Sequence, residues 1–261
     1  MNPSHRFISA LPRCLTSVAL AAILGIPSGA FALQVHGMKD AKVPAGMKPI
    51  RTDMPGHMTM TKLRPLAPGD RAKADAVVVA ARKAMAPYTD YRKALADGYR
   101  IFLPDVPQSV YHFSKRDYGI EANYQFDPLH PTSLLYSKDA KGQYKLVGVM
   151  YTDRADASMA ELNDRIPLSI AHWHLHTNFC EAPPGKQNEY FGPHAKYGLL
   201  GSITTEQECD AAGGDFYPHI FGWMVHVYPN AKNPSEIWSV HDDSKGHDNM
   251  DHSAMAGMPM Q

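Results

Sequence analysis

The pattern of apolar and polar positions divides the chain into helices followed by a series of strands. Residues 70–86 are rich in alanine and hold few helix breakers before Pro87, which predicts a helix. A second helix is predicted from a cap at Thr89 or Asp90 to Gly98. Strand-like runs follow at 99–103, 110–113, 132–137, 144–151, 168–176, 221–228 and 236–240. We therefore predict an α+β fold, with N-terminal helices followed by a mainly antiparallel β-sheet.

Shorter signals mark the connections between these elements. Residues 139–142 predict a hairpin turn between two of the strands. A short helix is expected within 155–164, and another after Thr205, where Thr and Glu are spaced as in a capping box. The stretch between Cys180 and Gly201 predicts a long loop, because it is rich in proline and glycine.

Methionine is concentrated outside this folded middle. Nine of the 14 methionines lie in 33–61 and 247–261, where glycine, proline, lysine and histidine are frequent and no regular period is present. Methionines that fill a core would lie in periodic segments instead. We therefore expect a flexible Met/Pro-rich arm at 33–69, an α+β metal-binding domain at 70–242 and a disordered Met/His-rich tail at 243–261.

The first 32 residues have the pattern of a secretory signal peptide. Basic residues at 5–13 precede an apolar run at 15–26, and a small-x-small site ends at Ala32. The apolar run is shorter than the roughly 20 residues that a membrane span needs. We expect cleavage after Ala32, a periplasmic or secreted location, and no stable membrane insertion once the signal is removed.

Charge and cysteine content narrow the choice of partners. The chain has 26 basic and 26 acidic residues, so its formal charge is zero and nucleic acid is not an expected partner. After signal cleavage, Cys180 and Cys209 remain, and an exported protein with two cysteines is expected to join them in a disulfide. A catalytic cysteine is the alternative.

The most specific pattern is a strand with three histidines. His172, His174 and His176 alternate with apolar residues, so they share one face, about 6.5–7 Å apart. Two of them can converge on one ion. The strand predicted at 221–228 offers His226, and His112 is a fourth candidate. We favour His174, His176 and His226 as ligands, with His172 and His112 as alternates.

Three imidazoles with an open coordination position suit Zn²⁺ or Cu²⁺ and are typical of reactive sites. The alternative is that these residues are ordinary hydrogen-bonded core histidines. His130, His194, His219 and His241 lie beside proline or in loops, and we expect them at the surface.

The C-terminal tail has a second kind of metal chemistry. Thioethers are soft, neutral ligands that select Cu(I). Residues 55–60 carry the same Met/His chemistry near the other end of the chain. The tail ligands are Met250, His252, Met255, Met258 and Met260. The tail resembles the Asp-His-Ser-x-Met-x-Gly-Met repeats of periplasmic copper-resistance proteins, which implies copper capture. A tail whose methionines bind nothing is the alternative.

The middle of the chain, from about 88 to 241, resembles a family of secreted bacterial proteins with no settled function. The matching stretches are 91–99, 111–113, 127–131, 134–136, 146–151, 173–176 and 223–227. By this likeness the family's histidine positions are matched by His112, His174, His176 and His226. That favours these four over His172. Many relatives carry glutamate where this chain has Thr132 and Met150.

These observations lead to a copper-binding protein for tolerance, storage or delivery, with other periplasmic copper-handling proteins as partners. Zinc is the alternative metal. The alternative function is a secreted three-histidine metalloenzyme, either a zinc hydrolase or hydratase or a copper oxidoreductase, since such an ion can lower the pKa of a bound water to about 7. Glu121, Asp127 and Glu181 are candidates for an acid or base beside the metal. The sequence also allows a structural module without metal, and leaves open whether the protein is an enzyme.

Overall fold

The computed structural model describes residue 54 and residues 56–240, so the predicted signal peptide and most of the two methionine-rich flanks lie outside it. Its helices and strands are β1 (Met58–Met60), α3 (Asp70–Met85), α4 (Tyr91–Ala96), β2 (Arg100–Ile101), β3 (Tyr111–Ser114), α5 (Arg116–Ala122), β4 (Ser133–Lys138), β5 (Tyr144–Asp153), α6 (Met159–Arg165), β6 (His174–Glu181), α7 (Glu206–Ala211) and β7 (Asp215–Val227).

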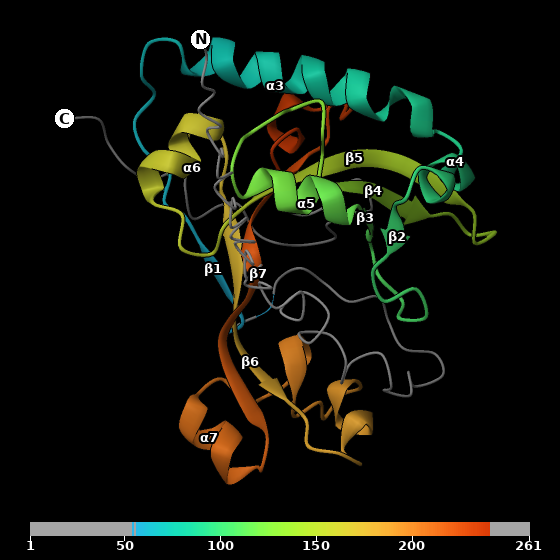
Figure 1. The fold of residues 1–261 in the computed structure, drawn as a ribbon, viewed down its shortest axis with the longest axis vertical. Helices are drawn as coiled ribbons and strands as arrows, with labels where there is room; N and C mark the ends of the chain where they lie inside the picture. Colours follow the sequence, from blue (N-terminus) through green and yellow to red (C-terminus); the bar gives the residue numbers. More distant parts are fainter. Residues whose placement is uncertain (1–53, 55, 241–261) are drawn as a thin grey trace, which may run out of the picture.

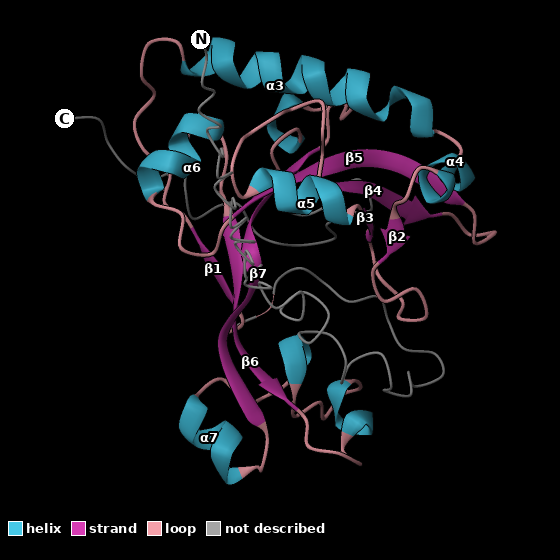
Figure 2. Ribbon diagram, viewed as in Figure 1, coloured by secondary structure: helices cyan, strands magenta, loops and turns pink. Residues whose placement is uncertain are grey.

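The described strands form one seven-stranded sheet in the order β1-β6-β7-β5-β4-β3-β2. Every pair of neighbours is antiparallel. Figures 1 and 2 show α3 lying along the sheet at one end of the molecule, with α5 and α6 close by, while α7 lies at the other end beside the far parts of β6 and β7. The arrangement confirms the predicted α+β fold.

The helix α3 forms where the alanine-rich segment predicts it. Its buried apolar positions recur every three or four residues, so they make one stripe that packs into the main core against the sheet. These positions are Ala74, Val77, Val78, Ala81 and Met85. The helix then gives way to a 3₁₀ turn that contains Pro87. Asp90 caps α4, as predicted, by accepting a hydrogen bond from the backbone of Arg92.

Two of the predicted strands are wrong in whole or in part. The strand expected over 168–176 begins only at His174, because the backbone N–H groups of Ile170 and Ala171 donate to the carbonyl of Pro167 and close a turn. The strand expected over 236–240 is absent from the described chain: a 3₁₀ turn at Pro234–Glu236 leads into irregular backbone.

Two elements lie where the sequence predicts none. The helix α5 follows β3 directly. The strand β1 lies within the arm expected to be flexible, and pairs Met58 with His176 and Met60 with His174. For this stretch the prediction of a flexible arm is wrong. The reason is tertiary, because the free edge of β6 offers backbone donors and acceptors that no local pattern in the arm reveals.

The two faces of the sheet carry different side chains. One face packs with α3 in the main core, which contains Phe113, Leu134, Tyr151 and Trp173. The opposite face carries the histidines and a smaller apolar cluster. Its buried members are Val110, Leu135, Met150, Met224 and Tyr228.

The sheet is strongly curled, and the histidine face is its concave side. His112 lies on β3 and His226 on β7, with β4 and β5 between them, which in a flat sheet would separate their backbones by about 14 Å. Their Nε2 atoms are nevertheless 3.2 Å apart. Two features bend the strands toward each other: a bulge after Leu135 and a close backbone approach at Gly148. A Cβ at position 148 would lie 2.5 Å from the carbonyl oxygen of Val227, so only glycine fits there.

The far ends of β6 and β7 form a second packed region with α7. Cys180 and Cys209 are joined in a disulfide with a Cα–Cα distance of 5.6 Å, which confirms the expected pairing. Gly214 is required beside it, because a Cβ there would lie 2.7 Å from Cys180 Sγ.

Removing this disulfide should destabilise the protein. The two cysteines are 29 residues apart, and closing such a loop in the unfolded chain is worth about 3 kcal/mol in the loop-entropy description. We expect the double variant Cys180→Ala/Cys209→Ala to lose about that much free energy of unfolding in urea denaturation. An unchanged midpoint would show that the disulfide contributes nothing.

Candidate metal centre

Strand register brings histidines from three strands to the concave face. On β6, His174 and His176 are two residues apart and share that face. On β7, Met224 lies directly opposite His174, and His226 is the next residue on the same face. His112 arrives from β3. His174 and His226 are almost completely buried, at 2% and 3% exposure.

The four rings form a continuous cluster. Ring centroids are 5.2 Å apart for His112 and His226, 5.0 Å for His174 and His226, and 5.7 Å for His174 and His176. The closest approach is the 3.2 Å between the Nε2 atoms of His112 and His226. The structure thus brings together four of the five histidines that the sequence predicts as metal ligands in the folded domain.

The other nitrogens of the closest pair already face backbone carbonyls. His226 Nδ1 lies 3.0 Å from the carbonyl oxygen of Val240, to which it donates when it carries the proton. The His112 ring makes a hydrogen bond to the backbone of Val110. Neutral rings with these tautomers direct two Nε2 lone pairs at each other, so a cation between them, a metal ion or a proton, is favoured.

A proton is the less favourable cation at neutral pH. Burial lowers the pKa of His112 from its ordinary 6.5 to about 4, and burial likewise lowers the pKa of His176 to about 4. His176 Nδ1 is also buried without a hydrogen-bond partner among the described residues. Neutral imidazoles with available lone pairs are the form that binds metal ions.

The depressed pKa values predict acid destabilisation of the metal-free protein. Between pH 6.5 and about 4 the unfolded chain binds protons at His112 and His176 that the folded chain does not. Stability is therefore lost as pH falls through this window, by up to about 1.4 kcal/mol per pH unit for each histidine. Urea denaturation in EDTA at several pH values measures the slope. The variant His112→Gln/His176→Gln should flatten it, and an equal slope in both proteins would contradict the assignment.

His172 has a different environment from the other strand histidines. His172 lies in the segment before β6 begins, and its Nδ1 is 2.6 Å from the carbonyl oxygen of Thr61. We predicted that the three histidines share one face of a strand, but the turn at Pro167 makes the strand begin only at His174. The prediction therefore holds for His174 and His176 and not for His172. The remaining predicted ligands, Met250, His252, Met255, Met258 and Met260, lie outside the described residues.

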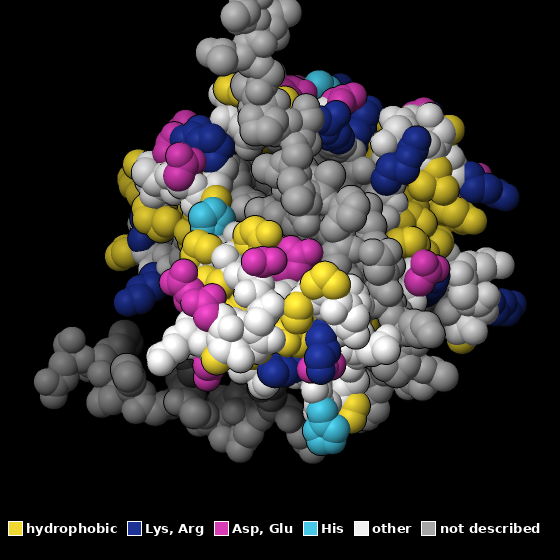
Figure 3. All heavy atoms as spheres, turned by 60° about the horizontal axis from the view of Figure 1, so that its bottom comes forward, with side chains coloured by type: hydrophobic (Ala, Val, Ile, Leu, Met, Phe, Trp, Pro, Cys, Tyr) yellow, Lys and Arg dark blue, Asp and Glu magenta, His cyan; other side chains and the backbone are white. Residues whose placement is uncertain are grey.

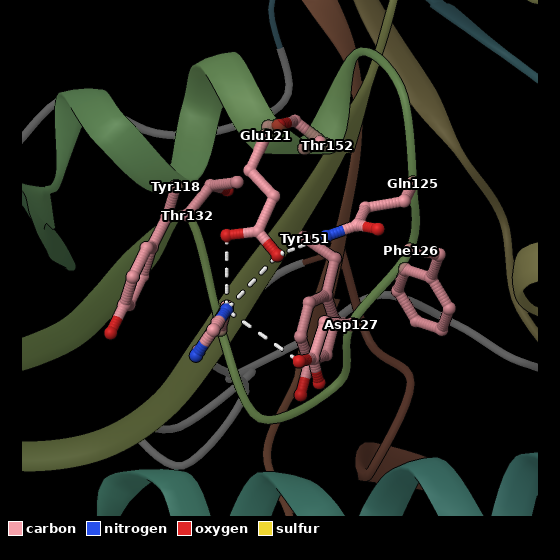
Figure 4. A pocket seen from close by; sticks show the side chains of 10 residues that line it. Tyr118, Glu121, Gln125, Phe126, Asp127, Thr132, Tyr151 and Thr152 are labelled. Carbon is pink, nitrogen blue, oxygen red and sulfur yellow. Dashed lines mark hydrogen bonds and ion pairs between the residues drawn. The ribbon is translucent and has the colours of Figure 1, made fainter.

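A second group of potential ligands lies on the other side of the sheet. Glu121, Asp127 and His130 each place one ligand atom within 4.8 Å of the others. Among the described residues, no other three His, Cys, Asp or Glu side chains lie as close together. In the described chain, no three histidines of the cluster have ligand atoms that all lie within 4.8 Å of one another. Glu121 comes from α5, and Figure 4 shows it and Asp127 pointing into the same space below the helix.

An ion pair explains this acidic group without a metal. His130 Nδ1 lies 3.0 Å from Glu121 Oε2 and 3.5 Å from Asp127 Oδ2, so one N–H occupies the place between the carboxylates. The hydrogen bond from His130 lowers the pKa of Glu121 below its usual range. Tyr118 stacks on the His130 ring at 4.4 Å, and the pocket beside this group offers only about 10 Å³, which is room for one water molecule.

Sequence reasoning missed this group, since His130 was expected simply at the surface. The segment from Asp127 to Pro131 does carry a signal: Asp127 accepts a hydrogen bond from the backbone of Leu129, a turn that Asp-Pro favours. That turn points His130 back at α5, whose presence the sequence did not reveal.

The three carboxylates considered for catalysis do not lie beside the cluster of His112, His174, His176 and His226. The pocket of Glu121 and Asp127 is lined by Tyr151, which belongs to the main core, whereas its neighbour Met150 faces the histidine side. Glu181 ends β6 and accepts a hydrogen bond from Tyr217, in the disulfide region. None of the three is placed to exchange a proton with a ligand in the histidine cluster.

On the face in Figure 3, basic and acidic side chains of the described residues are interspersed without a broad patch of one sign. None of the described helices combines the length and apolar character that a membrane span needs.

No protein-family model, no characterised protein and no solved structure matches this chain.

Proposed function

We propose that this chain is a periplasmic copper-binding protein, and that its folded domain holds one ion through His112, His226 and His174. The observation that carries the proposal is the 3.2 Å separation of the Nε2 atoms of His112 and His226. Two nitrogens bound at 2.0–2.1 Å to one tetrahedral ion lie about 3.3 Å apart. The pair is therefore spaced as two ligands of a single ion.

His174 is the best-placed third ligand. Its ring stands edge-on to that of His226, with the centroids 5.0 Å apart, so its imidazole is the next one in the cluster beside the pair. His176 lies one ring further along β6. Imidazole ligands suit both copper and zinc. Copper is favoured over zinc by the methionine-rich composition of the chain, whose thioethers bind zinc poorly.

The tail belongs to this proposal as a collector of copper. Residues 250–260 contain four thioethers, which are soft ligands, and one imidazole. An exported protein meets copper outside the cytoplasm, and thioethers survive there without needing deprotonation. A metalloenzyme has less support, because none of the three carboxylates considered for catalysis lies beside the histidine cluster.

Thermal unfolding of the full chain with added metal tests the proposal. An ion that binds only the folded state at 100 times its dissociation constant stabilises it by about 2.7 kcal/mol. We expect Cu²⁺ to raise the melting temperature of the wild type and of His130→Ala, and not that of His174→Ala. His130→Ala is the matched control, because it removes the one histidine of the group that His130 forms with Glu121 and Asp127 on the other face.

Two outcomes would refute the proposal. One is a melting temperature that no added Cu²⁺ or Zn²⁺ changes in the wild type. The other is a stabilisation that persists in His174→Ala and disappears in His130→Ala, which would place the ion among Glu121, Asp127 and His130.

A further inference from the structure

We infer that Met150 and Met224 make the histidine centre selective for Cu(I), and that Met60 is the point at which the ion enters. This inference rests on the proposed function and deepens it: it names the oxidation state of the bound ion and the residues that choose it. It concerns side chains of the folded domain, separate from the methionines of the tail.

Every methionine of the described strands lies opposite a histidine. The register pairs Met58 with His176, Met60 and Met224 with His174, and Met150 with His226. Directly paired residues of an antiparallel sheet share a face, with their Cβ atoms about 4.5–5.5 Å apart. All four thioethers therefore belong to the histidine face, and the described strands place none on the opposite face.

One row of this face leads from solvent to the interior. It crosses three adjacent strands as Met60, His174 and Met224, alternating thioether, imidazole and thioether. Met60 on the edge strand β1 is 46% exposed, whereas His174 and Met224 are 2% and 5% exposed. His226, two residues beyond Met224, and its partner Met150 continue the set inward.

The surroundings of the inner thioethers favour a soft monovalent ion. Met150 and Met224 pack with Val110, Leu135 and Tyr228 in the small apolar cluster. Desolvating a doubly charged ion without an anionic ligand is costly, and less so for a singly charged one. Neutral thioether and imidazole ligands match Cu(I), which accepts soft ligands, while Zn²⁺ gains little from a thioether.

The test compares Cu(I) and Zn²⁺ affinities of leucine variants that keep the side-chain volume. The full chain is used, with Met250, Met255, Met258 and Met260 replaced by leucine in every sample so that the tail does not compete. Cu(I) affinity is measured anaerobically against bicinchoninate, and Zn²⁺ affinity against a chromophoric zinc chelator. Met85→Leu is the control, because Met85 is equally buried, at 4% exposure, in the core on the opposite face.

We expect Met150→Leu and Met224→Leu each to lose about tenfold or more in Cu(I) affinity, with Zn²⁺ affinity and the Met85→Leu variant unchanged. Met60→Leu should slow Cu(I) uptake at unchanged affinity. Its control is Met159→Leu, since Met159 in α6 has the same 46% exposure.

The outcomes separate this inference from the proposed function. Unchanged Cu(I) affinity in both inner variants, or an equal loss of Cu(I) and Zn²⁺, would overturn the selectivity while His226→Ala still loses both metals. Uptake by Met60→Leu at the rate of Met159→Leu would overturn the access point. Full Cu(I) and Zn²⁺ binding by His226→Ala would instead overturn the proposed function.

Discussion

Replacing His226 with alanine is expected to lower the affinity of the protein for Cu²⁺ and Zn²⁺ by on the order of 100-fold or more. Changes to groups around a metal ligand already cost 10–100-fold, and this variant removes a ligand. His226 is central to the cluster: its ring contacts those of both His112 and His174. Isothermal titration of the full chain measures the loss.

The matched control for this variant is on the same strand. His219 also lies in β7, but it is exposed and pairs with Thr177 in the part of the sheet near the disulfide. His219→Ala should bind Cu²⁺ as the wild type does. Circular dichroism of both variants without metal checks that the fold is kept. Equal affinity in His226→Ala and His219→Ala would show that the cluster is not the site.

Replacing Arg165 with methionine should produce the largest loss of stability among single substitutions considered. Arg165 Nε lies 2.7 Å from Asp153 Oδ2; the Asp153 side chain is almost completely buried, and that of Arg165 is 11% exposed. The guanidinium also donates to the carbonyl oxygens of Ala122 and Thr152, which ties α5 to β5. Burial already raises the pKa of Asp153. Leaving that carboxylate without its partner should cost about 3–5 kcal/mol.

An exposed ion pair provides the comparison. Lys73 Nζ lies 3.0 Å from Asp164 Oδ1, on α3 and α6, and both side chains are well exposed to water. Such pairs are worth about 0–1 kcal/mol, so Lys73→Met should change the free energy of unfolding little. Urea denaturation at pH 7 measures both variants. A similar small loss in the two would mean that the Arg165 guanidinium does not stabilise the contact between α5 and β5.

Local sequence signals predicted the elements that local physics controls. The helix α3, the cap at Asp90 and the hairpin turn at 139–142 all formed as expected; in the turn, the Gly142 N–H donates to the carbonyl of Asp139. Each depends on residues a few positions apart. The disulfide was also predictable, since only Cys180 and Cys209 remain after the predicted signal peptide.

The site depended on longer-range effects. Alternation along 168–176 grouped His172 with His174 and His176, but the turn at Pro167 left His172 outside the strand. His112 was only an alternate ligand, because its closeness to His226 arises from the curl of the sheet. That curl comes from a bulge and a glycine whose effect on distant strands no local pattern reveals.

The same limit applied to β1. Its residues Met58–Met60 have no period of their own, and only the open edge of β6 makes them a strand. The methionines that the sequence assigned to a flexible arm thereby come to lie beside the histidines. The composition of the chain suggested copper, whereas the strand register shows that the thioethers of Met58 and Met60 lie opposite His176 and His174.

Anomalous diffraction at the copper absorption edge, from crystals of the full chain with one equivalent of copper, locates the bound ion. We expect one strong peak between the imidazoles of His112 and His226, about 2 Å from each Nε2 atom. A peak between the side chains of Glu121, Asp127 and His130, or none within reach of His226, would contradict this expectation.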